Sequence, residues 1–85
     1  MSRLSKAQSM ILISGAVLLG RHGHVLSEHE QATVASAGLR FRDKGDAAFI
    51  TGNEWGVIEP AVRAMQAARA EAERTAKRGI EETVR

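Results

Sequence analysis

The chain contains 85 residues, of which 44% are hydrophobic and none is cysteine. This length allows one small domain, 1–85, the hydrophobic fraction argues against disorder, and the missing cysteine excludes disulfides, thiolate zinc sites and a cysteine nucleophile. The formal net charge is only +2, and no segment forms a basic arm, so the composition does not indicate a general nucleic-acid groove. A cytoplasmic protein is the default expectation.

The first predicted helix opens with a capping box, Ser5-x-x-Gln8, and we expect Gly20 to end it. Residues 10–19 are almost entirely apolar. They are too few for a membrane span, which needs about 20 apolar residues, and no signal-peptide cleavage site follows them. We therefore expect a helix buried on several sides and no transmembrane segment.

A three-helix domain cannot easily cover such a helix by itself, so the pattern predicts a homo-oligomer, a dimer or larger. The interface would combine the first helix with the apolar stripe of the last one. Its candidate residues are Met10, Ile13, Val17, Leu18 and Met65.

The second predicted helix follows the loop GRHGHVL, residues 20–26, and begins with another capping box formed by Ser27 and Glu30. We expect it to run to about Phe41, where the turn sequence RDKGDA follows. Its expected buried face consists of Val34, Ala35, Gly38, Leu39 and Phe41.

The third predicted helix begins with Thr51 and Glu54 as cap and partner, and Ile50 with Trp55 has the spacing of a hydrophobic staple. Pro60 should end a short helix near residue 59 or kink it there. A long alanine-rich helix should follow, with residues 76–85 frayed.

The starts of the second and third helices share one pattern. HVLSEHEQATVASA, residues 24–37, and AFITGNEWGVIEPA, residues 48–61, both place an aliphatic residue, a Ser or Thr cap and then Glu at the same spacing. This repeat predicts a tiny two-stranded bridge between Val25–Leu26 and Phe49–Ile50.

One half of the repeat resembles an EF-hand calcium loop. DKGDAAFITGNE, residues 43–54, has Asp43 in the first loop position and Glu54 in the twelfth. The loop needs oxygen ligands at its third and fifth positions, where this chain has Gly45 and Ala47. We therefore expect no calcium site and no cofactor.

All the histidines lie in one short segment, HGHVLSEHE, where two glutamates alternate with them. This cluster could meet a zinc or nickel ion, contact a protein partner, or be a plain polar loop. Nothing in the spacing is specific to a metal, so the metal-site prediction is none. The candidate partner-binding residues are His22, His24, Glu28, His29 and Glu30.

Nucleic-acid binding is the main alternative. The segment ATVASAGLRFRDKG has the Ala and Gly of a helix-turn-helix, but charge and Gly45 interrupt it too soon for a recognition helix. Phosphate contacts could still come from basic side chains on the second and third helices. The candidates are Arg40, Arg42, Arg74, Lys77 and Arg78.

Enzymatic chemistry has little support in the sequence. No Ser lies in a Gly-x-Ser-x-Gly turn, and no Gly-rich phosphate loop is present. We expect an all-α protein of three main helices that is not an enzyme. The favoured function is a small protein-binding module that regulates or inhibits a larger partner, in the style of a phage accessory protein.

Overall fold

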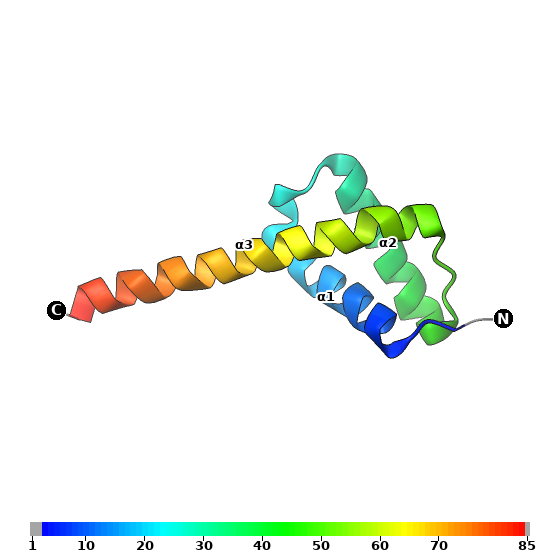
Figure 1. Ribbon diagram of the computed structural model, residues 1–85, viewed down its shortest axis with the longest axis horizontal. Coiled ribbons are helices and arrows are strands. Elements are labelled where there is room, and N and C mark those ends of the chain that lie inside the picture. The colour runs from blue at the N-terminus through cyan, green and yellow to red at the C-terminus, as the bar shows by residue number, and fades with distance from the viewer. Residues whose placement is uncertain (1–2, 85) are drawn as a thin grey trace.

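The computed structural model describes the backbone of residues 3–84 and the side chains of residues 3–76. Three helices make up the described fold: α1 (Lys6–His22), α2 (Glu28–Lys44) and α3 (Gly52–Val84). Single 3-10 turns, η1 (Gly23–Val25) and η2 (Gly45–Ala47), connect them. α3 lies across the other two helices and then projects away from them, giving extents of 58 × 25 × 18 Å (Figure 1). The predicted all-α class is confirmed.

All three helix starts are the predicted capping boxes. The backbone N–H of Gln8 donates to Ser5 Oγ at 3.0 Å, and that of Glu30 donates to Ser27 Oγ at 3.2 Å. Glu54 makes the same bond to Thr51 Oγ1 at 3.1 Å. These contacts are local, which is why sequence spacing alone locates them.

The core lies where the three helices cross at Gly15 of α1. A Cβ atom there would lie 3.1 Å from Val62 of α3 and 3.2 Å from Val34 of α2, so glycine permits the close approach. Around this crossing the helices bury apolar side chains that form one cluster. Its members are Leu12, Leu18, Leu26, Val34, Ala37, Ile50, Ile58, Ala61, Val62 and Met65.

Gly20 does not end α1, contrary to expectation. The helix continues to His22, and Gly23 caps it by donating its backbone N–H to the Leu19 carbonyl. A left-handed stop needs a positive φ, and among the described residues only Gly45 has one, at 61°. Leu18 before Gly20 and Gly23 after it are both buried, so packing carries the helix past Gly20.

The buried face of α2 differs in part from the predicted one. Val34 is buried as expected, and so is Ala37, which is not part of the predicted face. Ala35 and Leu39 are exposed. Because Val34 and Ala37 are three residues apart, they share the inward face, whereas Ala35 is rotated about 100° from Val34. α2 also continues past Phe41 and ends at Lys44, before the Gly45 turn.

Pro60 does not divide the third helix, and the expected end near residue 59 is wrong. α3 is continuous through Pro60. Proline inside a helix costs about 3 kcal/mol, but Ile58 before it and Ala61, Val62 and Met65 after it are all buried on one face. Burial on both sides of the proline therefore keeps the helix intact.

The predicted bridge between the two repeat segments is not found, since residues 3–84 contain no strand. Val25 belongs to η1, and the Phe49 carbonyl accepts a hydrogen bond from the Arg40 side chain at 3.0 Å. The repeat is thus a shared helix start. The described helices also include none that is long and apolar enough to cross a membrane, as expected.

Candidate protein-binding surface

α1 is buried along only one face, and a row of large apolar side chains lies on the opposite face. Leu12, Gly15 and Leu18 face the core. Met10, Ile13 and Val17 are 52%, 43% and 69% exposed. Their spacing of three and four residues places them in a line along the helix, which we call the α1 ridge. The bundle covers one side of α1 and leaves this ridge to solvent.

Basic side chains stand at both ends of the α1 ridge. Lys6 precedes Met10 by four residues and Arg21 follows Val17 by four, so both lie on the ridge's side of the helix. Both are exposed. Neither forms an ion pair with any carboxylate among the described side chains, and α1 contains no acidic residue. The ridge is therefore an apolar line bracketed by positive charges that have no acidic partner among the described side chains.

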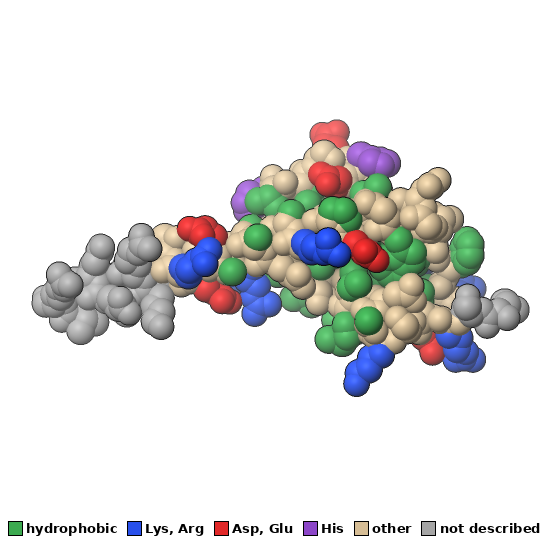
Figure 2. All heavy atoms as spheres, viewed as in Figure 1, with side chains coloured by type: hydrophobic (Ala, Val, Ile, Leu, Met, Phe, Trp, Pro, Cys, Tyr) green, Lys and Arg blue, Asp and Glu red, His purple; other side chains and the backbone are tan. Residues whose placement is uncertain are grey.

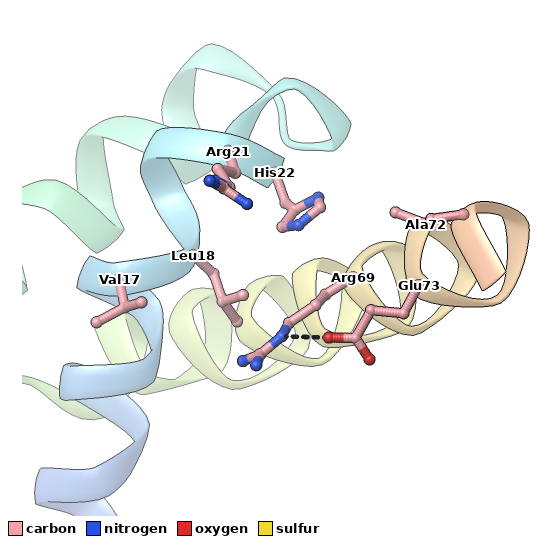
Figure 3. A pocket seen from close by; sticks show the side chains of 8 residues that line it. Val17, Leu18, Arg21, His22, Arg69, Ala72 and Glu73 are labelled. Atoms are coloured by element: carbon pink, nitrogen blue, oxygen red, sulfur yellow. Dashed lines mark hydrogen bonds and ion pairs between the residues drawn. The ribbon is translucent and has the colours of Figure 1, made fainter. Parts of the chain in front are cut away.

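A groove opens where α3 leaves the bundle beside the end of α1, and we call it the α1–α3 groove. Its volume is about 560 Å³. Figure 3 shows Arg21 and His22 on the α1 side and the Arg69–Glu73 pair on the α3 side. The complete lining is Val17, Leu18, Arg21, His22, Arg69, Ala72, Glu73 and Ala76. Because Val17 belongs to both features, and Arg21 at the end of the ridge also lines the groove, the ridge and the groove form one continuous surface.

Charges in the groove are unequal. Arg69 Nε donates to Glu73 Oε1 at 3.2 Å, so the single acid of the lining is already engaged. Arg21 and His22 remain beside this pair. Figure 2 shows hydrophobic side chains at the surface of the bundle and side chains of both charges on the projecting part of α3. The groove is thus partly apolar with an excess of basic groups.

The residues of the predicted histidine cluster lie in three successive elements, the end of α1, η1 and the start of α2, and their role in binding a partner stays a prediction. His22 lines the α1–α3 groove, whereas His24, Glu28 and His29 are exposed. The imidazole rings of His22 and His24 are 6.4 Å apart between centroids. Within the described part of the chain, no group of three or more potential ligands is placed to hold a metal ion.

Glu30, the last member of that cluster, has a structural role. Its carboxylate accepts the Ser27 backbone N–H at 2.8 Å in the capping box. This hydrogen bond lowers the pKa of Glu30 below its ordinary value. Glu30 is consequently engaged by its own helix start.

Two of the predicted oligomer-interface residues lie inside the bundle. Leu18 and Met65 are buried in the core of the single chain. The sequence groups them with the others because all are apolar, and periodicity does not tell an inward face from an outward one on an all-apolar helix. Met10, Ile13 and Val17 are the members that the chain presents at its surface.

Three of the five basic residues of the nucleic-acid alternative have described side chains, and two of these three are paired with acids. Arg40 donates to Glu54, to Ser36 Oγ and to the Phe49 carbonyl, and Arg74 pairs with Glu71. Arg42 is exposed. The side chains of Lys77 and Arg78 lie outside the described residues.

The sequence-based prediction missed the groove and the Arg40–Glu54 pair. The sequence did contain an indication of the groove, because Ala72 and Ala76 continue the spacing of the buried Val62 and Met65 along α3. What periodicity could not show is where α1 ends and leaves this face uncovered. Arg40 and Glu54 belong to different helices, so no short-range pattern connects them.

No protein-family model, curated protein or solved structure matches the chain. The assignment of this surface therefore depends on its own geometry. That geometry is an exposed apolar line on a helix, ending in a partly apolar groove with basic edges.

Proposed function

We propose that this protein is a non-enzymatic protein-binding module that regulates or inhibits a larger partner through the α1 ridge and the α1–α3 groove. The main observation in support of this function is that Met10, Ile13 and Val17 are exposed in one line on a well-packed helix. Single exposed apolar residues are common on protein surfaces. Apolar residues that are aligned and continue into a groove form a contiguous patch instead, and contiguous apolar patches mark interaction sites.

A helix is the partner element that fits this surface. Side chains at spacings of three and four residues form a ridge that packs into the grooves of a second helix. Ala16 and Gly20 beside the ridge are exposed and small, which permits a close approach. Recognition would follow the helix-in-groove mode, with few large side chains supplying most of the affinity.

The proposed cellular location and biological role are supported by general features of the sequence. A short chain without cysteine is compatible with action in the cytoplasm and with a phage-type accessory role. The predicted homo-oligomer, now without the buried Leu18 and Met65, is the competing use of the same ridge, because a second copy bound there would exclude the larger partner. The pairing of Arg40 and Arg74 with acids weakens the nucleic-acid alternative.

Site-specific photo-crosslinking tests the proposed surface. Benzoyl-phenylalanine is introduced at Ile13 or Val17 and, as the control, at Ala67, an exposed position on α3 that is rotated about 200° from the buried Met65 and does not line the groove. Illumination in the native cells should give one discrete heterologous product from the ridge positions and none from Ala67. The product should disappear when Met10→Glu is added.

Crosslinking that is equally strong from Ala67 and the ridge, or absent from the ridge, would overturn the proposal. A sole product of twice the 9.2 kDa chain mass would also overturn it, because it would show that the ridge serves self-association.

A further inference from the structure

We infer that the segment bound by the α1 ridge is an amphipathic α-helix of another protein that carries acidic residues beside its apolar stripe. This inference rests on the proposed function and deepens it. The apolar ridge requires a partner segment that is apolar along one face. The positive charges at the ends of the ridge favour acidic residues beside that apolar stripe.

Charge complementarity carries the inference. Lys6 and Arg21 bracket the ridge about four turns apart, and neither pairs with an acid among the described side chains. Arg3, before the helix, is different, because it already pairs with Asp46 at 3.1 Å. A helix lying along the ridge would place its flanking residues near Lys6 at one end and Arg21 at the other. Acidic residues there would gain two ion pairs, and basic ones would be repelled.

The α1–α3 groove strengthens this preference at the Arg21 end. Arg21, His22 and Arg69 line it, and its one acid, Glu73, is held by Arg69. An acidic side chain entering the groove would meet Arg21 with no competing carboxylate free among the lining residues. The apolar part of the lining, including Val17 and Ala72, would receive the end of the partner's apolar stripe.

The same charges disfavour a second copy of this chain as the occupant. A two-fold interface brings identical surfaces together. An antiparallel pairing of α1 with α1 centred on Ile13 would set Lys6 of one copy near Arg21 of the other at both ends. α1 has no acidic residue to offset this repulsion. An acidic helix from a different protein would replace this repulsion between like charges with attraction.

Two synthetic peptides test the inference directly. Both have about 20 residues, enough to span the ridge, and the same leucine stripe at spacings of three and four. One carries Glu at every flanking position and the other carries Lys. Fluorescence anisotropy with the full 85-residue chain gives the Kd of each at low and high salt.

The acidic peptide should bind about tenfold more tightly than the basic one at about 0.1 M salt. The difference should largely vanish at about 1 M salt, where the Debye length is about 3 Å. The double variant Lys6→Glu/Arg21→Glu should reverse the preference. Ile13→Glu should weaken the binding of both peptides.

A matched control separates local charge from overall charge. Arg63→Glu/Arg74→Glu changes the net charge equally, and its residues are eleven apart on a face of α3 that does not line the groove. It should keep the preference for the acidic peptide. Loss of the preference in this control would overturn the inference, since overall charge alone would then explain it.

The remaining outcomes distinguish the inference from the proposed function. Equal binding of both peptides, abolished by Ile13→Glu, would overturn the acidic partner and leave the ridge as a binding surface. Absence of peptide binding would overturn the acidic helix, while crosslinking from the ridge would still decide the proposed function. A dimer by sedimentation that Ile13→Glu dissociates would identify a second copy as the occupant and overturn the inference.

Discussion

The Arg40 guanidinium of α2 forms a bidentate ion pair with the Glu54 carboxylate of α3, with Nη1 donating to Oε1 at 2.9 Å and Nη2 donating to Oε2. Glu54 is at the same time the capping-box partner of Thr51, whose backbone N–H donates to Oε1 at 3.0 Å. Arg40 also donates to the Phe49 carbonyl just before that cap. One pair therefore joins the end of α2 to the start of α3 and holds the connecting loop.

Because of this pair, the unfolding free energy should decrease as the pH becomes acidic. The hydrogen bond from Arg40 and then that from the Thr51 backbone lower the pKa of Glu54 to about 2. A lowered folded-state pKa contributes stability above the unfolded value of about 4.3 and loses it as the pH falls toward 2. Because the two side chains are 35% and 24% exposed, solvent screening reduces the contribution to about 1 kcal/mol.

Glu54→Gln isolates that contribution. Glutamine can still accept the Thr51 N–H in the capping box, but it carries no charge to titrate. Urea unfolding at neutral pH and at about pH 3 should show a smaller loss of unfolding free energy for Glu54→Gln than for the wild type. Equal losses would contradict the role of the pair. Glu30→Gln is the control for the cap alone, since the capping box lowers the pKa of Glu30 and no ion-pair partner is present among the described side chains. It should reduce the acid-dependent loss by less than Glu54→Gln does.

Two methionines provide a matched test of which face of α1 and α3 is core. Met65 is 0% exposed and Met10 is 52% exposed. Met65→Ala should lower the unfolding free energy by about 2–5 kcal/mol through lost burial and the cavity left behind. Met10→Ala should change it by less than about 1 kcal/mol. Denaturant titrations of both variants measure the difference, and similar losses would show that the ridge is covered in solution.

Two glycines of α1 should respond in opposite directions to a side chain. Beyond the local helix backbone, no atom lies within 4 Å of the place that a Cβ on Gly20 would take, so Gly20→Ala should stabilise by up to about 1 kcal/mol through helix propensity. Gly15 is crowded by Val34 and Val62, so Gly15→Val should destabilise by about 1–3 kcal/mol. Thermal unfolding compares them, and a stable Gly15→Val would refute the close crossing.

Pro60 should weaken α3 even though it does not break it. Proline lacks the N–H that would bond the carbonyl four residues earlier, and its ring crowds that carbonyl. Pro60 is exposed, so Pro60→Ala should restore the bond without disturbing the core and raise the unfolding free energy by about 1–3 kcal/mol. The increase should appear in urea unfolding. A loss of stability in Pro60→Ala would show that the proline favours the native geometry.

The sequence by itself determined the features that depend on neighbouring residues. The three capping boxes, the Gly45 turn and the all-α class follow from spacings of a few residues, because the interactions that produce them are local. The apolar run of α1 was likewise evident.

Only the tertiary structure decided which apolar residues face the core and which face solvent. On a helix that is apolar nearly all round, Leu18 and Val17 look equivalent in sequence, yet one is buried and the other is exposed. The choice depends on where α2 and α3 cross α1, which the close approach at Gly15 sets. Packing likewise carried α3 through Pro60 and brought Arg40 to Glu54, because contacts between helices outweigh local preferences there.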